Sequence, residues 1–290
     1  MTTEKPCTTA GSARQAVSKI QPNLGEVQET LLIPLYGRAC DAAKRRPMLG
    51  DVRARELVDT LDYDFSRFRG GSLPGSVLRT AIFDVWVRQF LGDHPQGTVV
   101  ELGTGLNTRF ERVDNGQVRW FDLDLPDAIE LRRRYFADTD RRTMLAGSAL
   151  DTDWFDTVAT APAPYLFVAE AVFLYFPEDR VHRAIGNLAD RFGGSLLVID
   201  TSGRTMIENQ HRNGAMKAVT AEMQWICDDP RELSVWGLQL LDSRTMATPQ
   251  PELTSRLPAR YRYGMPTLAK ILPGLVNTYR FNLFRLGDAL

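Results

Sequence analysis

The chain has 290 residues, enough for one large domain with additions, and its 35 Lys and Arg side chains nearly balance 36 Asp and Glu side chains. Without a basic excess, the composition gives no reason to expect binding to nucleic acid or to an acidic membrane. The cysteines Cys7, Cys40 and Cys227 form no CxxC pair, so neither a disulfide framework nor a metal site is predicted. The sequence shows no signal peptide and no membrane-spanning stretch, and we expect a cytoplasmic protein.

The N-terminal third is predicted to be a tail followed by helices. Residues 1–25 are rich in Thr, Ser, Ala and Gln, and we expect a mobile tail there. Residues 26–92 are predicted to form a helical cap in three pieces: one from Gln28, one over 51–61 with Asp51 as its N-cap, and one over 76–91. Pro34 is expected to begin or kink the first of these helices.

Strands and helices then alternate along the chain. Strands are predicted at 98–102, 117–123, 143–147, 164–170 and 195–200, and helices from Asn107, from Pro126 and over 177–192. This alternation indicates an α/β fold with a parallel, doubly wound sheet, formed by 97–201 and 230–290 and closed by two antiparallel strands. Residues 202–229 are polar and are predicted to be a largely helical lid insertion. The basic run at 132–134 is expected to be a solvated helix face.

The turn after the first predicted strand carries the main functional signal. Gly103 and Gly105 would let the backbone approach a nucleoside-bearing ligand, with Glu101 on the strand itself and Asn107 opening the helix. The dinucleotide fingerprint GxGxxG would need a third glycine, but the chain has Thr108. The pattern therefore favours S-adenosylmethionine over a nicotinamide cofactor. A dinucleotide enzyme and a plain strand–turn–helix remain alternatives.

Polar residues follow the ends of several predicted strands, where open α/β sheets bind their ligands. Asp122 and Asp124 stand at the tip of the second strand, where ribose hydroxyls need acceptors. Ser148 follows the third strand, where an adenine ring would lie. Glu170 comes directly after the apolar run YLFVA, and a carboxylate there is costly to bury without a function. By contrast, Asp151 and Asp153 are interpreted as surface carboxylates.

Four motifs in order make the interpretation more specific: VVELGTGLNTRFER, WFDLDLPDAIELRRR, LAGSALDTDW and VAEAVFLYFPEDRV. Together with PLYGRACDAA and LRTAIFD upstream, they resemble the leucine carboxyl methyltransferase family, in particular its bacterial branch of polyketide O-methyltransferases related to tetracenomycin carboxyl methylation. The resemblance covers about residues 28–287. It implies a Rossmann-like class I methyltransferase that uses S-adenosyl-L-methionine. The chain departs from the family pattern at Asn107, where Asp is common, and at Ala149-Leu150, where Asp-Leu is common.

The resemblance implies a role for each matching residue. Gly103 and Gly105 would line the methionine portion, and Asp124, or alternatively Asp122, would take the ribose. Arg79 would pair with the cofactor carboxylate, joined by Arg38, and Glu170 would reach the ammonium group. The full set of expected cofactor-binding residues is Arg38, Arg79, Glu101, Gly103, Gly105, Asn107, Asp122, Asp124, Ser148, Ala149, Leu150, Glu170 and Ala171.

The acceptor decides whether the reaction needs a base. A carboxylate, with a pKa of about 4, is already ionised at neutral pH, whereas a phenol, with a pKa of about 10, would profit from a base. Of His94, His182 and His211, only His211 in the lid is a candidate base, and this scarcity favours a carboxylate acceptor. A phenol acceptor and a non-catalytic binder remain alternatives, and the sequence predicts no oligomeric state. A flat aromatic small-molecule acceptor is expected to contact Tyr175, His211, Met223, Trp225 and Trp236.

Overall fold

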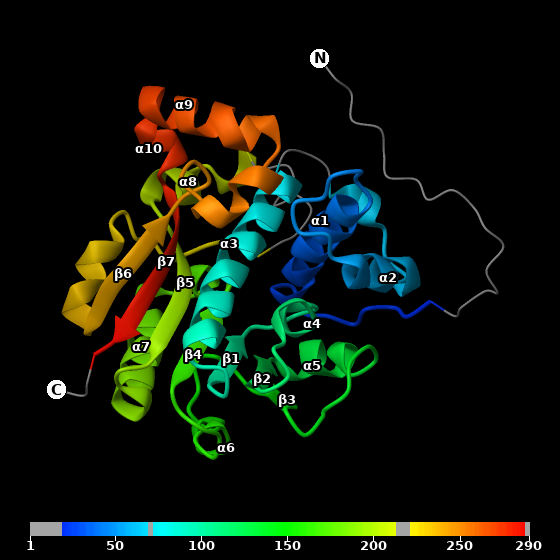
Figure 1. Ribbon diagram of the computed structural model, residues 1–290, viewed down its shortest axis with the longest axis vertical. Helices are drawn as coiled ribbons and strands as arrows, with labels where there is room; N and C mark the ends of the chain where they lie inside the picture. The colour runs from blue at the N-terminus through cyan, green and yellow to red at the C-terminus, as the bar shows by residue number, and fades with distance from the viewer. Residues whose placement is uncertain (1–18, 69–71, 213–220, 288–290) are drawn as a thin grey trace.

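The computed structural model describes residues 19–68, 72–212 and 221–287 and contains a seven-stranded sheet in the order β3-β2-β1-β4-β5-β7-β6 (Figure 1). The strands are β1 (Thr98–Leu102), β2 (Arg119–Asp124), β3 (Arg142–Ala146), β4 (Tyr165–Ala169), β5 (Leu196–Ser202), β6 (Leu238–Arg244) and β7 (Tyr279–Leu286). The limits of β1 to β5 each lie within two residues of those of a predicted strand. The α/β fold class predicted from the sequence is therefore confirmed.

The direction of the strands fixes which ends meet. β1 to β5 pair in parallel, whereas β7 runs antiparallel to both β5 and β6. Ser202, at the end of β5, pairs with Tyr279, at the start of β7. The first residue of β7 therefore lies at the edge of the sheet where the parallel strands end. This confirms the two antiparallel strands predicted to finish the sheet.

Helices cover both faces of the sheet. The long helix α3 (Ser72–Asp93) lies across one face (Figure 1) and packs on Val99, Leu166 and Val198. Helices α6 (Phe155–Val158) and α7 (Glu178–Phe192) pack on the other face, against side chains such as Val100 and Phe167. Neighbouring residues of one strand thus point to opposite faces and both become buried. This is why Val99 and Val100, which are neighbours in β1, are both apolar.

The N-terminal cap forms as predicted, but the tail boundary moves. Beside α3 lie η1 (Gln28–Leu31), α1 (Leu32–Ala42), α2 (Val52–Thr60) and η2 (Phe65–Arg67). The side chain of Asp51 accepts a hydrogen bond from the Ala54 amide, which confirms the predicted N-cap. Residues 1–18 of the expected tail lie outside the described residues. Residues 19–25 are held in place, because Ile20 forms a bridge with Leu61 and the Gly25 amide donates to Asp127.

The described part of the segment 202–229 contains two short helical pieces. Only α8 (Arg204–Glu208) and η4 (Gln210–Arg212) are helical, residues 221–227 carry no regular secondary structure, and 213–220 lie outside the described residues. Beyond it come η6 (Pro230–Trp236), η7 (Pro251–Arg256), η8 (Arg260–Gly264), α9 (Met265–Ile271) and α10 (Pro273–Val276). No helix in the described ranges is long and apolar enough to cross a membrane.

Candidate active site

A cavity of about 380 Å³ opens at the carboxyl edge of the sheet. Its walls come from η1, α1 and α3, from the glycine turn after β1, and from the residues that follow β2, β3 and β4. Fourteen of the residues predicted from the sequence line this cavity: Arg38, Arg79, Glu101, Gly103, Gly105, Asn107, Asp124, Ser148, Ala149, Leu150, Glu170, Ala171, Tyr175 and Met223. Residues spread over 186 positions of the chain (38 to 223) are thus brought to one place.

The glycine turn requires both of its glycines. Gly103 and Gly105 have φ angles of 62° and 50°, a region that side chains disfavour. A Cβ on Gly103 would lie 2.5 Å from Val172 Cγ2, and one on Gly105 would lie 3.0 Å from Leu31 Cβ. The Gly105 amide donates to Asp124 Oδ2 at 2.6 Å. The turn therefore presents bare backbone to the cavity and fixes the carboxylate at the tip of β2.

Glu101 is a buried carboxylate with one oxygen unused. Its Oε1 accepts hydrogen bonds from Asn107 Nδ2 at 2.8 Å and from Arg109 Nη1 at 2.5 Å. Its Oε2 is buried without a hydrogen-bond partner among the described residues. Burial raises the pKa of Glu101 to about 7, although the Arg109 cation acts to lower it. A donor or cation placed in the cavity would satisfy Oε2.

Glu170, by contrast, has both oxygens occupied. Oε1 accepts from Arg79 Nε at 2.9 Å and from Thr80 Oγ1 at 2.7 Å, and Oε2 accepts from Arg109 Nη2. Burial acts to raise the pKa of Glu170, but the cations Arg79 and Arg109 hold it below its ordinary value. The sequence predicted that Glu170 would reach an ammonium group. In this structure Glu170 lines the cavity and its carboxylate anchors Arg79.

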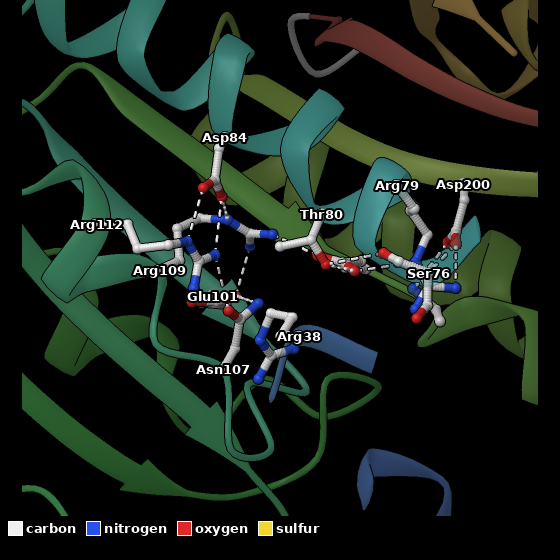
Figure 2. Close-up of polar contacts among 12 residues, drawn as sticks. Arg38, Ser76, Arg79, Thr80, Asp84, Glu101, Asn107, Arg109, Arg112 and Asp200 are labelled. Atoms are coloured by element: carbon white, nitrogen blue, oxygen red, sulfur yellow. Dashed lines mark hydrogen bonds and ion pairs between the residues drawn. The ribbon is translucent and has the colours of Figure 1, made fainter. Parts of the chain in front are cut away.

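Arg109 connects the two carboxylates, and the sequence analysis gave it no role. Figure 2 shows its guanidinium between Asp84 and Glu101, and its Nε donates to Asp84 Oδ1 at 2.8 Å. It also pairs with Glu170, and its side chain is fully buried. Arg109 is the first residue of α4 (Arg109–Val113), the helix that follows the glycine turn. This position next to the turn was the one signal in the sequence that could have indicated a role for Arg109. Arg109 therefore positions two carboxylates that line the cavity, those of Glu101 and Glu170.

Arg38 is one of the two cations that the sequence assigned to the cofactor carboxylate. The side chain is buried, and it donates from Nε to Asp51 Oδ2 at 2.9 Å and from Nη2 to the Leu106 carbonyl at 2.9 Å. Burial lowers its pKa from the ordinary value, against the opposing effect of Asp51. Arg38 is thus held rigidly at the cavity wall and is no solvated helix position.

Asp122 does not line the cavity, although it was the alternative ribose ligand. Its Oδ1 accepts from Arg132 Nη2 at 3.0 Å, and its Oδ2 from Arg142 Nε at 2.6 Å. Burial acts to raise its pKa, but these two cations keep it below the ordinary value. Arg132 is itself fully buried in α5 (Pro126–Arg132), so the expectation that this basic run is a solvated face was wrong for Arg132. Of the two aspartates, Asp124 is the one that lines the cavity.

Three residues expected at the acceptor lie elsewhere. Trp225 and Trp236 stack on each other with ring centroids 5.8 Å apart and line a separate cleft behind the lid. His211 is 70% exposed and lies 3.7 Å from Glu222, outside the lining of the main cavity. Along the segment 202–229, which carries His211 and Trp225, the sequence shows no periodicity that would tell which side chains point inward. Tyr175 and Met223 do line the main cavity.

The structure also brings two residues to the cavity that were not predicted from the sequence, Met246 and Tyr279. Met206, Met246 and Tyr279 join the lining, and Met206 and Tyr279 pack against the small apolar cluster that contains Met223. Tyr279 Oη accepts from Arg79 Nη1 at 2.9 Å and donates to Asp200 Oδ2. Its position depends on β7 running antiparallel beside β5, and spacing along the chain gives no hint of it.

Comparison with known proteins agrees with this geometry. Residues 32–189 match the family model for leucine carboxyl methyltransferase. The chain is 34% identical over 236 residues to tetracenomycin polyketide synthesis O-methyltransferase TcmP of Streptomyces glaucescens, covering 78% of this chain and 87% of that protein. It is 27% identical over 240 residues to S-adenosyl-L-methionine-dependent methyltransferase dpfgK of Gibberella zeae, covering 75% and 80% of the two chains.

A solved structure supports the fold independently. The crystal structure of a presumed methyltransferase from Thermobifida fusca YX superimposes with a TM-score of 0.56 at 16% identity, covering 88% of this chain and 96% of that chain. At this identity the likeness concerns the fold alone. The family match extends over more than half of the chain. The chain belongs to the leucine carboxyl methyltransferase family and is an S-adenosylmethionine-dependent methyltransferase.

Proposed function

We propose that this enzyme binds S-adenosyl-L-methionine in the main cavity and methylates a carboxylate of an aromatic, polyketide-type small molecule. The observation that carries the cofactor assignment is the unpartnered Oε2 of Glu101 in a cavity also lined by Arg38 and Arg79. A methionine end carries an ammonium and a carboxylate, and therefore needs an anion and a cation in the same pocket. Glu101, Arg38 and Arg79 supply this anion and these cations, so the lining of the cavity fits the methionine end of S-adenosylmethionine.

Each part of the cofactor has a matching element in the cavity. Arg79 and Arg38 would hold the carboxylate. Glu101, with its unpartnered Oε2, would take the ammonium in preference to Glu170, whose two oxygens already accept hydrogen bonds. Asp124, held by the Gly105 amide, would accept from the ribose. Residues 148–150 would flank the adenine. The cofactor, when bound, supplies an activated methyl group, and the chain supplies alignment and a dry pocket.

The acceptor proposal rests on the lining of the remaining space. Tyr175, Met206, Met223 and Met246 provide a polarizable, largely apolar surface suited to a flat ring system. Among the residues that line the cavity there is no histidine, so the ordinary neutral-pH base is missing there. A carboxylate acceptor needs none. The name of the Streptomyces relative, a polyketide synthesis O-methyltransferase, agrees with an aromatic polyketide acceptor.

Calorimetry with S-adenosylmethionine and S-adenosylhomocysteine tests the cofactor assignment. Arg79→Ala should weaken the affinity for both ligands at least tenfold, since it removes a buried charge-assisted partner worth about 1.5–3 kcal/mol. Arg183→Ala, an arginine that is 73% exposed on α7, is the matched control and should leave the affinity unchanged. Equal affinities of Arg79→Ala and wild type would remove Arg79 from the site.

The same titrations separate the competing cofactor. The position of the third dinucleotide glycine holds Thr108, which is buried and donates from Oγ1 to Asp51 Oδ2 at 2.5 Å. The turn is therefore tied to the helical cap and does not follow the dinucleotide pattern. Binding of NAD without binding of the adenosyl ligands would overturn the proposal. Mass spectrometry with a labelled methyl donor and a panel of aromatic acids would identify the acceptor group.

A further inference from the structure

The structure contains a buried tyrosine–carboxylate pair that methylation of a carboxylate does not require. Tyr279 lines the main cavity and its Oη donates to Asp200 Oδ2. Asp200 lies within the buried part of β5 and is 1% exposed. The phenol ring packs at 85° against Phe281, with ring centroids 5.3 Å apart, which limits its freedom to rotate. The pair is thus pre-positioned with one end in the cavity and the other in the protein interior.

We propose that Tyr279 and Asp200 act as a proton relay that lets this enzyme also methylate hydroxyl acceptors, such as phenols. The proposal rests on the cofactor site described above. The acceptor hydroxyl donates to Tyr279 Oη, and as its proton moves to Tyr279, the Tyr279 proton moves to Asp200 Oδ2. The oxygen electron pair released in this way forms the new C–O bond while the methyl–sulfur bond of the donor breaks, leaving a neutral thioether. Asp200 returns its proton to water when the product leaves.

The position of Tyr279 in the cavity places the Tyr279–Asp200 pair next to the proposed acceptor space. Tyr279 joins the cluster of Leu174, Ile207 and Met223, together with Met206, on the lid side of the cavity. It also contacts Arg79, which marks the methionine end. The phenol oxygen therefore lies at the boundary between the space for the methyl donor and the space for a flat acceptor. A base that serves an in-line methyl transfer has to stand at this boundary.

The surroundings of Asp200 suit a proton acceptor. The charged and titratable groups that face it are Arg79 from α3, Tyr279 from β7, Glu170 after β4 and Tyr175 from η3. Burial raises the pKa of Asp200, and the Arg79 cation and the Tyr279 hydrogen bond oppose this in part. A carboxylate with a raised pKa takes a proton more readily than a surface carboxylate does.

The backbone amide of Ala171 holds Asp200 in a fixed position. Both oxygens of Asp200 accept from the Ala171 amide, at 2.9 and 3.1 Å. Ala171 has a φ angle of 56°, which is unfavourable for a residue with a Cβ and persists only where its surroundings enforce it. The fixed amide holds the carboxylate in place beside Tyr279. The structural alternative is that Asp200 and Tyr279 merely orient Arg79 and the backbone at Ala171.

A matched pair of acceptors distinguishes the relay from this alternative. The two compounds share one aromatic ring system and carry either a carboxyl or a hydroxyl group. Tyr279→Phe should lower kcat for the hydroxyl acceptor about 100-fold, the usual contribution of a positioned base, so the ratio of hydroxyl to carboxyl turnover should fall by a similar factor. Tyr263→Phe, at a tyrosine that is 62% exposed, is the control and should keep the wild-type ratio.

The pH profile gives a second readout that a purely orienting role would not change. Asp200→Asn keeps an oxygen that can accept from the Ala171 amide but cannot take a proton. Without the relay only the ionised phenol reacts, so kcat/KM of this variant should rise tenfold per pH unit up to the acceptor pKa of about 10. The wild-type profile for the hydroxyl acceptor should instead level off once Asp200 is ionised.

Clear outcomes would overturn the relay. Wild-type enzyme that turns over none of the hydroxyl acceptors contradicts it, as does an unchanged turnover ratio in Tyr279→Phe or identical pH profiles for Asp200→Asn and wild type. Calorimetry with S-adenosylhomocysteine is run on every protein. If the wild-type protein does not bind S-adenosylhomocysteine, the proposed function itself is rejected. If it binds this ligand and one of the three results above is found, only the relay is rejected.

Discussion

At the scale of single residues, the proposed role of Glu101 predicts that cofactor binding depends on pH. Its pKa of about 7 means that the carboxylate is largely protonated at pH 6 and largely ionised at pH 8. An ammonium group binds the ionised form, so affinity for S-adenosylhomocysteine should rise about tenfold from pH 6 to pH 8, as the linkage relation requires. Calorimetric titrations at the two pH values measure this. Glu101→Gln should bind S-adenosylhomocysteine more weakly and with an affinity that does not depend on pH. If the affinity of this variant still rises from pH 6 to pH 8, a group other than Glu101 causes the pH dependence.

Asn107 is the residue at which the glycine turn departs from the family pattern. Its Nδ2 donates to Glu101 Oε1 at 2.8 Å, and its Oδ1 accepts from Arg112 Nη2 at 3.1 Å. Asn107→Asp replaces the donor with a second carboxylate next to Glu101, and like charges raise a pKa. The rise in affinity should therefore shift to higher pH in this variant, in the same titrations. An unshifted curve would show that Arg112 compensates the new charge fully.

At the scale of elements, the turn between β1 and α4 depends on Gly103. Gly103→Ala should lower the free energy of unfolding by about 1–3 kcal/mol, because it combines a left-handed backbone with an overlap on Val172. Urea unfolding followed by circular dichroism measures the loss. Gly92→Ala is the control: nothing lies within 4 Å of its added Cβ and it sits in helix α3, so it should be neutral or stabilising.

A second substitution separates the two causes at Gly103. Val172→Ala removes the methyl groups that the new Cβ would meet. In the Gly103→Ala background it should recover part of the lost stability, although alone it is expected to be destabilising. Purely additive effects would mean that the backbone conformation, and not the overlap with Val172, accounts for the loss.

Elements with a regular pattern were predictable from the sequence, and contacts between elements were not. β1 was predicted with its observed limits because its five residues are all buried and three of them, Val99, Val100 and Leu102, are apolar. Arg132 was placed wrongly because it was assigned to a run of like charges; its spacing from Ala128 and Ile129 puts it on their buried helix face, toward Asp122. The approach of Tyr279 to Asp200 depends on the pairing of β5 with β7. No local signal encodes that pairing.

At the scale of the whole molecule, buried ion pairs join the cap to the sheet. Asp84 in α3 holds Arg109 and Arg112 of α4, and Asp51 at the start of α2 holds Arg38 and Arg112. Figure 2 shows Asp84, Arg109 and Arg112 in contact, with Glu101 and Asn107 below them. Removing one partner leaves buried charges unpaired. The network therefore ties the cofactor end of the cavity to the stability of the whole chain.

Asp84→Asn tests this connection. The variant should lose about 3–5 kcal/mol of unfolding free energy at pH 7, measured by urea unfolding, because Arg109 and Arg112 lose their carboxylate. Asp156→Asn is the control, since Asp156 is 95% exposed and lies 3.4 Å from Arg191. A loss no larger in Asp84→Asn than in the control would show that water or rearrangement compensates the buried cations.

Acid should reproduce the effect of the mutation. Burial acts to raise the pKa of Asp84, but Arg112 and Arg109 lower it to about 2, below the ordinary value of 3.8. A group whose pKa is depressed in the folded state stabilises it above the unfolded pKa and loses that contribution as the pH falls through the folded pKa. The stability difference between wild type and Asp84→Asn should therefore shrink between pH 4 and pH 2. A constant difference over this range would contradict the assignment.

The antiparallel last strand also has a consequence for biosynthesis. A ribosome releases β5 and β6 long before β7, yet β6 pairs only with β7 in the described sheet, and β5 uses β7 as its outer neighbour. Until the final strand emerges, the nascent chain carries an unprotected apolar edge of the kind that recruits other chains. Translation that stops short of Tyr279 would leave a chain with its glycine turn but without its relay tyrosine. Completion of the sheet and completion of the acceptor site are therefore the same late event.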